Sequence, residues 1–208
     1  MCSSDLGWAE QSPDSWWEQV QLAIRRVIQQ GGFDPLAIGA IGIAYQMHGL
    51  VCIDHDGKVL RNSIIWCDSR AVPYGERAYE KLGGQKVLPQ LLNSPGNFTA
   101  AKLAWVKEQE PDCYRKIRHI LWPGDFIAFR LTGNVTTTPS ALSEGIFWDF
   151  SREAVSKDIL QVFDFPERLL PPVQEVFSVH GELSKNIAQQ LGLKAGIPVA
   201  YKAGRSEE

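Results

Sequence analysis

The sequence predicts an α/β unit that carries a helical insertion. Two apolar runs of strand length and a short hairpin follow an amphipathic helix within residues 12–66, whereas the pattern after residue 72 is mainly helical. The chain of 208 residues is 44% apolar and 22% charged, which is ordinary for a globular core. It shows no internal repeat and no flexible linker, so we expect one domain or a large piece of a larger protein.

The first elements are predicted from residues that start or end helices and from the spacing of apolar residues. A helix begins at Ser12-Pro13-Asp14-Ser15, where proline and an acidic residue suit a first turn, and it ends at Gly31-Gly32. Residues 38–45 are apolar and too short for a core helix, so we interpret them as a buried strand that runs into the turn Gln46-Met47-His48-Gly49.

A hairpin and a further strand are expected next. Residues 51–53 and 58–60 flank Asp56-Gly57, which is a strong signal for a tight turn between two strands. Residues 63–66 are expected to form another strand that ends in the cluster Trp66-Cys67-Asp68-Ser69-Arg70.

From residue 72 onward we expect helices, and no strand before residue 197. A loop is expected at 136–139, and Pro171-Pro172 indicates an extended crossing. The expected helices are 73–82, 99–108 with Thr99 as its cap, 111–118, 125–131, 153–162 and 184–191, and a final strand begins at 197–201.

Charge and composition exclude several classes of protein. A net charge of −3 with scattered Lys and Arg residues gives no electrostatic footprint for nucleic acid. No apolar stretch approaches the ~20 residues needed to cross a bilayer, and the first residues do not resemble a signal peptide. The four cysteines lack metal-ligand or paired spacing. We therefore predict a cytoplasmic protein with free thiols and no membrane or nucleic-acid partner.

The two polar clusters at the ends of predicted strands suit a polyhydroxylated ligand. Gln46, Met47 and His48 follow one strand, and the His48 imidazole can both donate to and accept from hydroxyl groups. Trp66 offers a flat apolar face for the C–H side of a sugar, and Asp68 can accept from two hydroxyls. Strand alternation would send Trp66 and Asp68 to the same side. We therefore predict a sugar site.

Each of these residues also has a structural interpretation. His48 would then be a turn histidine with local hydrogen bonds, Trp66 would be a core residue, and Asp68 would cap the following helix and pair with Arg70. Asn97 precedes a predicted helix and is explained equally well as a cap. A metal centre is not predicted, because the four histidines His48, His55, His119 and His180 are isolated in the sequence.

The two ends of the chain are predicted to be foreign. Cys2-Ser3-Ser4-Asp5-Leu6 and Arg205-Ser206-Glu207-Glu208 can be encoded by nucleotide strings that are reverse complements over their shared length. Read-through of a sequencing adapter would produce this relation. We expect residues 1–6 and 205–208 to be scars around a native segment 7–204, with coincidence as the alternative.

Five motifs occur along the chain in a fixed order. They are Gln46-Met47-His48-Gly49, Ile65-Trp66-Cys67-Asp68-Ser69-Arg70, Asn97-Phe98-Thr99-Ala100-Ala101-Lys102-Leu103, Pro123-Gly124-Asp125-Phe126-Ile127 and Gly196-Ile197-Pro198-Val199. In this order they resemble the N-terminal half of the FGGY carbohydrate kinases, and most of all their xylulokinase branch. Tyr45 departs from the small residue expected before Gln46.

The resemblance implies a ribonuclease H-like fold of the actin and hexokinase type, with this chain as a sugar-binding N-terminal lobe truncated at both ends. It implies an ATP- and Mg²⁺-dependent kinase acting on D-xylulose, with Met47, His48 and Asn97 near the sugar. The family's phosphate-binding turn would precede Gly7, and its Asp general base would follow Gly204, where Arg205 stands. The chain alone is therefore expected to be inactive.

Several alternatives stay open at this point. The substrate of the parent protein would be ribulose, fuculose, gluconate or glycerol instead of xylulose, or the chain would be a sugar-binding lobe without catalysis. A third alternative is a fragment that folds poorly alone, because the missing first hairpin would leave the edge of residues 38–45 exposed. A homodimer is compatible with all of these.

Overall fold

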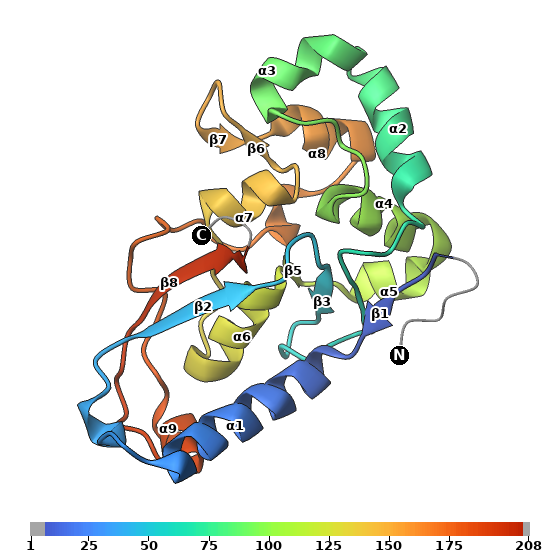
Figure 1. Ribbon diagram of the computed structural model, residues 1–208. Coiled ribbons are helices and arrows are strands. Elements are labelled where there is room, and N and C mark those ends of the chain that lie inside the picture. Colours follow the sequence, from blue (N-terminus) through green and yellow to red (C-terminus); the bar gives the residue numbers. More distant parts are fainter. Residues whose placement is uncertain (1–6, 206–208) are drawn as a thin grey trace.

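The computed structural model describes residues 7–205 (Figure 1). Residues 1–6 and 206–208, which include most of both predicted scars, lie outside the described residues. The helices are α1 (Pro13–Gln30), α2 (Val72–Lys81), α3 (Leu88–Leu91), α4 (Thr99–Gln109), α5 (Pro111–Lys116), α6 (Pro123–Thr132), α7 (Pro139–Glu144), α8 (Lys157–Phe163) and α9 (Lys185–Leu191). The strands are β1 (Glu10–Gln11), β2 (Ile41–Tyr45), β3 (Val51–Ile53), β4 (Ser63–Ile64), β5 (His119–Leu121), β6 (Trp148–Asp149), β7 (Ala154–Val155) and β8 (Val199–Gly204).

Two strands from opposite ends of the chain form the centre of the fold. β2 and β8 pair in parallel, with Ile43 opposite Lys202 and Tyr45 opposite Gly204. Helix α6 packs against both strands, as Figure 1 shows. A buried ion pair of 2.7 Å between Lys202 Nζ and Asp125 Oδ1 joins β8 to α6. The strand expected near residue 197 is thus confirmed, and its partner is β2.

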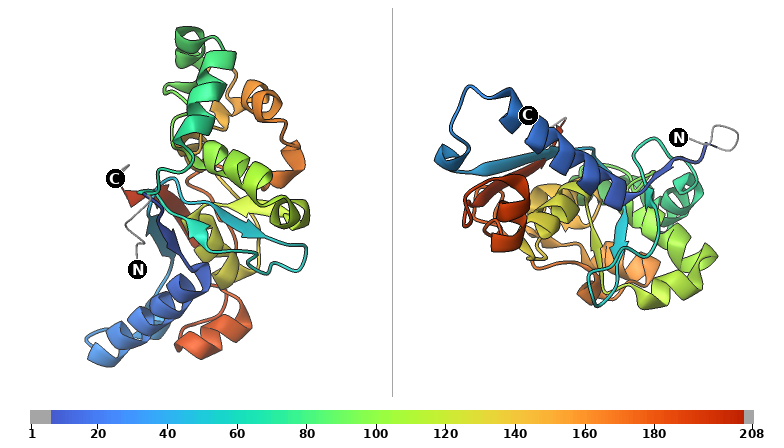
Figure 2. Two further views of the ribbon diagram at one scale, coloured as in Figure 1. Left: turned by 90° about the vertical axis from the view of Figure 1, so that its right-hand side faces the viewer. Right: turned by 90° about the horizontal axis from the view of Figure 1, so that it is seen from below.

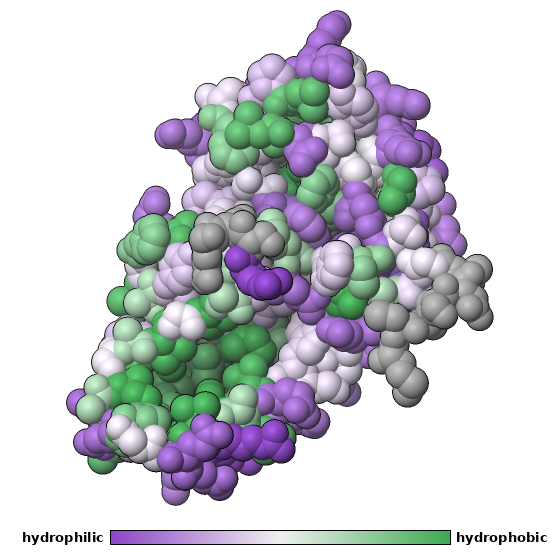
Figure 3. Space-filling view, viewed as in Figure 1, coloured by the Kyte–Doolittle hydropathy of each residue, from purple (hydrophilic) through white to green (hydrophobic). Residues whose placement is uncertain are grey.

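Strand β2 is shorter and less buried than predicted. Residues 38–40 are not part of it, and Gly42 and Ala44 are exposed while Ile43 and Tyr45 are buried. The exposed face lies in an apolar trough of about 520 Å³ between α1, β2 and α6. Figure 3 shows this trough as a green hollow at the lower left. Among the described residues β2 pairs only with β8, so its other edge is open, as the sequence predicted.

The predicted hairpin forms, but its partners include strands that the sequence analysis missed. Ile53 bridges Val59 across the Asp56-Gly57 turn. On its other side β3 pairs antiparallel with β5, although no strand was expected between residues 72 and 197. Likewise β1 pairs antiparallel with β4. Strands of two or three residues carry no periodicity of their own, so only their partners define them.

The helical part differs from the prediction in its boundaries. Helix α8 begins at Lys157 after the Ser156 cap, whereas a start at residue 153 was predicted. Residues 154–155 instead form β7 with β6. The expected loop at 136–139 leads directly into α7, which Thr138 caps. Figure 1 and the left view of Figure 2 place α2, α3 and α8 at the end of the molecule opposite α1 and α9.

The helical part is close-packed against the segment that precedes α4. Gly75 lies in α2, and a Cβ added there would lie 1.8 Å from the carbonyl oxygen of Gly96. Backbone atoms cannot yield as a flexible side chain would. Only glycine therefore allows α2 to approach this segment.

We predict that Gly75→Ala lowers the free energy of unfolding by about 2 kcal/mol because of this overlap. In an unobstructed helix the same change would stabilise the fold by up to ~1 kcal/mol. Urea unfolding monitored by circular dichroism measures the difference. Gly39→Ala is the matched control, because its added Cβ meets nothing within 4 Å, and its effect should stay within about 0.5 kcal/mol. A stabilising Gly75→Ala would contradict the packing described.

Candidate functional site

A hollow of about 350 Å³ lies beyond the carboxyl ends of β2 and β8. Crevices at this edge of parallel strands are the usual ligand sites of α/β proteins. Trp66 reaches the hollow from the turn after β4, and its side chain is 60% exposed. The lining residues are Tyr45, Gln46, Met47, His48, Trp66 and Arg205. The structure therefore brings together four of the six predicted site residues, but not Asp68 or Asn97.

The turn after β2 has a special backbone conformation. His48 has φ of 58°, in the left-handed region that non-glycine residues seldom occupy. Gly49 follows it, and a Cβ there would lie 2.6 Å from the side chain of Pro123 at the start of α6. The left-handed conformation of His48 and the close approach of Gly49 to α6 together reverse the direction of the chain beside the hollow.

The ring of His48 is oriented from two sides. Its Nδ1 lies 2.8 Å from the main-chain oxygen of Glu144, at the end of α7. A carbonyl oxygen only accepts, so Nδ1 carries a proton, and in a neutral imidazole with this tautomer Nε2 is an acceptor. The Phe98 ring contacts the imidazole edge-on, with 4.6 Å between centroids. His48 thus has the local hydrogen bond of its structural interpretation and also lines the hollow.

Gln46 is connected to the N-terminal segment. Its Nε2 donates to Gln11 Oε1 at 3.2 Å, and the same oxygen accepts from Trp16 Nε1 at 2.8 Å. These bonds link the hollow to β1 and α1.

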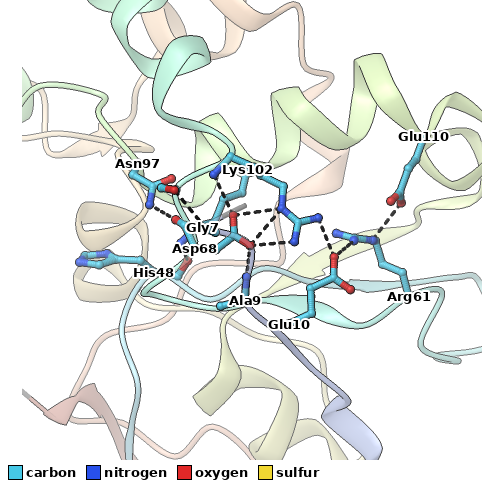
Figure 4. A network of polar contacts seen from close by, with 11 residues as sticks. Gly7, Ala9, Glu10, His48, Arg61, Asp68, Asn97, Lys102 and Glu110 are labelled. Atoms are coloured by element: carbon cyan, nitrogen blue, oxygen red, sulfur yellow. Dashed lines mark hydrogen bonds and ion pairs between the residues drawn. The ribbon is translucent and has the colours of Figure 1, made fainter. Parts of the chain in front are cut away.

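Asp68 is not placed as the alternation rule predicted. The strand β4 ends at Ile64, and residues 66–67 form a turn, so Trp66 points outward while Asp68 is fully buried. The Asp68 carboxylate accepts from Ala9 N at 2.5 Å and from Arg70 Nε and an Arg70 terminal nitrogen at 3.0 and 2.7 Å. Figure 4 shows this network. The carboxylate is committed to protein partners, so the expected contact with sugar hydroxyls is corrected to a structural role with Arg70.

Asn97 supports the same cluster and does not cap α4. The N-cap position belongs to Phe98, and neither Phe98 nor Thr99 supplies a capping side chain. The Asn97 amide nitrogen instead donates to the main-chain oxygen of Asp68 (Figure 4). Asn97 thus holds the loop that presents Trp66.

Two buried ionisable residues behind the hollow were missed from the sequence. Lys102 is fully buried in α4, and its Nζ donates to the His48 carbonyl oxygen at 2.8 Å (Figure 4). Burial lowers the pKa of its ammonium to about 8, against the opposing effect of the Asp68, Cys67 and Glu144 charges. Glu144 is 5% exposed. A lysine among the apolar residues of 99–106 was the available signal in the sequence.

Neither a metal site nor a membrane segment is found in the described part of the chain. Within residues 7–205 no group of three His, Cys, Asp or Glu side chains is arranged to hold a metal ion. No helix there is long and apolar enough to span a bilayer. No disulfide joins the described cysteines Cys52, Cys67 and Cys113.

Comparison with known proteins defines the class to which this fold and site belong. Residues 2–206 match the model of the FGGY family of carbohydrate kinases, N-terminal domain. The chain belongs to this family. The resemblance inferred from the five motifs is thereby confirmed.

The alignments with named relatives cover almost the whole chain. The xylulose kinase of Bacillus subtilis (strain 168) is 33% identical over 90% of this chain and 38% of its own length. A glycerol kinase of Thermococcus gammatolerans is 30% identical over 95% of this chain and 40% of its own length. The crystal structure of xylulose kinase from Rhodospirillum rubrum superposes with a TM-score of 0.88 at 26% identity, covering 97% of this chain and 42% of that one.

These similarities confirm the predicted fold class, that of the sugar kinases with an actin- and hexokinase-like architecture. They also show that the chain spans about 40% of the length of the curated relatives it matches.

We predict that Asp68→Asn lowers the free energy of unfolding by about 3 kcal/mol, because removal of one partner leaves a buried charge on Arg70. Urea unfolding measures the loss. Asp112→Asn is the matched control, since Asp112 pairs with Arg115 on the surface with 84% of its side chain exposed, and such pairs contribute about 0–1 kcal/mol. Equal effects of the two changes would show that the Asp68 pair is not structural.

A pH dependence follows from Lys102. Its pKa of about 8 in the folded chain lies below the ordinary value of 10.5, so between these values the unfolded chain binds more protons than the folded chain. The contribution of Lys102 to stability should therefore rise as pH increases from 8 to 10.5 and be smallest below pH 8. Urea unfolding across this range should show the wild-type chain gaining stability relative to Lys102→Met. A pH-independent difference between the two chains would refute this.

Proposed function

We propose that this chain is the sugar-binding part of an ATP-dependent carbohydrate kinase whose substrate is a ketopentose, with transfer of a phosphoryl group to O5 of D-xylulose. The observation that carries the proposal is the meeting of Met47, His48 and Trp66 in one hollow at the end of β2. The names of several relatives support xylulose over other sugars. The described cysteines form no disulfide, which fits a cytoplasmic enzyme.

The chemistry of the lining residues suits a sugar. The neutral His48 ring offers an acceptor at Nε2 for a hydroxyl, since its Nδ1 proton is directed at the Glu144 carbonyl oxygen. The exposed indole of Trp66 offers an apolar face to the C–H side of the ring or chain. Met47 adds a flexible apolar contact. Asp68 and Asn97 would act indirectly, by fixing the loop that carries Trp66.

ATP would supply the phosphoryl group, and Mg²⁺ would offset the charge on its phosphates. Among residues 7–205 no group of three His, Cys, Asp or Glu side chains is arranged to hold such an ion. Closure of a second lobe over the open hollow would exclude water, which otherwise competes as the acceptor.

A second candidate is sugar binding without catalysis, and the observation that favours it is Arg205. This residue lines the hollow at the end of β8, where the family resemblance places an Asp general base. A guanidinium cannot accept the proton of an attacking hydroxyl near neutral pH. Under this candidate the chain binds the sugar through the same residues and transfers nothing.

We predict that D-xylulose quenches the tryptophan fluorescence of the chain in a saturable way and more strongly than D-ribulose or glycerol do. His48→Gln should weaken binding at least tenfold, because it removes the imidazole acceptor, as expected for a loss of about 1.5 kcal/mol. The matched control is His55→Gln, since His55 lies exposed in the hairpin turn. Trp66→Phe should abolish most of the fluorescence change. A folded chain that responds to none of the three ligands would overturn the proposed site.

A further inference from the structure

Lys102 occupies a position that core packing alone does not explain. Helix α4 is buried from Thr99 to Val106, and Lys102 in its middle has no exposed surface. Burying an ammonium group carries a large desolvation cost unless the group is paired and hydrogen-bonded. A leucine or methionine would fill the same volume without this cost, so the charge or the donor must have a use.

The hydrogen bond of Lys102 points to that use. Nζ lies 2.8 Å from the carbonyl oxygen of His48, 54 residues earlier in the chain. This carbonyl belongs to the residue with φ of 58°, whose backbone is costly to maintain without support. Lys102 therefore holds the main chain at the one residue of the turn where the left-handed conformation has to be kept.

The side chain of His48 is held independently of its main chain. Nδ1 faces the Glu144 carbonyl oxygen from α7, and Phe98 packs edge-on against the ring from the start of α4. With Lys102 on the carbonyl, three contacts from two helices determine the direction of Nε2. Figure 4 shows Lys102, His48, Asp68 and Asn97 close to one another.

The charges around the ammonium suit this position. Asp68, Cys67 and Glu144 act on Lys102 in the direction that favours its charged form, whereas Arg70 opposes it. The residue that holds the turn is thus electrostatically linked to the residue that fixes the Trp66 loop.

We propose that Lys102 is a positioning residue of the sugar site, which fixes the His48 main chain from beneath the turn and so directs the His48 ring toward the ligand without touching the ligand itself. The inference rests on the proposed function of the hollow. It predicts that replacement of Lys102 changes both the orientation of the His48 ring and the affinity for the sugar.

The test compares Lys102→Met with Lys107→Met on the same helix. Lys107 is also a lysine of α4, but its Nζ bonds to Phe163 and Asp164, away from the hollow. D-xylulose affinity is measured by isothermal titration calorimetry, and the His48 imidazole is observed by ¹⁵N NMR in the free chain. We expect Lys102→Met to weaken binding at least tenfold and to shift the His48 ring signals. Lys107→Met should change affinity less than twofold and leave those signals in place.

Lys102→Gln, which keeps a donor on a shorter side chain, should recover part of the affinity. If neither Lys102 variant folds, the wild-type chain decides the matter through ¹³Cε NMR of its lysines. Saturation with D-xylulose should then shift the Lys102 signal and not the Lys107 signal, and an unchanged Lys102 signal would overturn the proposal.

The outcomes separate this proposal from the proposed function. A folded Lys102→Met chain with normal affinity and unchanged His48 signals removes the role of Lys102 and leaves the sugar site intact. A wild-type chain that binds no sugar removes the proposed function, and with it the inference that rests on it.

Discussion

The parallel pairing of β2 with β8 is the constraint on which the rest of the structure depends. It joins residues 41–45 to residues 199–204, so an early and a late segment of the chain lie side by side in the middle of the fold. Helix α6 packs on this pair, and the buried Lys202–Asp125 ion pair fixes its position. Every side chain of the hollow except Trp66 follows directly from one of these two strands or ends one of them. The strand pairing therefore creates the site.

Buried charge supports the hollow from behind. The Arg70 guanidinium pairs with Asp68 and lies over the rings of Trp8 and Trp105, at 4.1 and 4.7 Å from their centroids. Glu10 extends this network to Arg61. Because the partners are desolvated, each contact is directional and hard to replace by water. The N-terminal segment is thereby tied to the same cluster that positions the Trp66 loop.

The hollow and the apolar trough are both open surfaces, and the chain matches only part of the length of its relatives. The hollow is open to solvent, and the apolar trough along α1 and β2 adjoins a strand edge that is unpaired among residues 7–205. Relatives are more than twice as long as the matched region. A sugar kinase needs a second lobe to enclose the reacting groups, so an open hollow on this chain agrees with the proposed role of a sugar-binding part.

The sequence by itself determined the family, most helices and the turn Gln46-Met47-His48-Gly49, because motif order, helical spacing and caps such as Ser12 and Ser184 are local properties. It also predicted that Met47, His48 and Trp66 belong to one site, and the structure brings these three residues into one hollow. Only the tertiary structure decided that Asp68 is buried against Arg70, that Asn97 holds the Asp68 loop and that Lys102 supports His48. These roles join residues up to 54 positions apart, and short strands such as β5 exist only through their partners. The burial of a side chain and a long-range hydrogen bond both depend on how other segments pack, so neither produces a periodic pattern in the sequence.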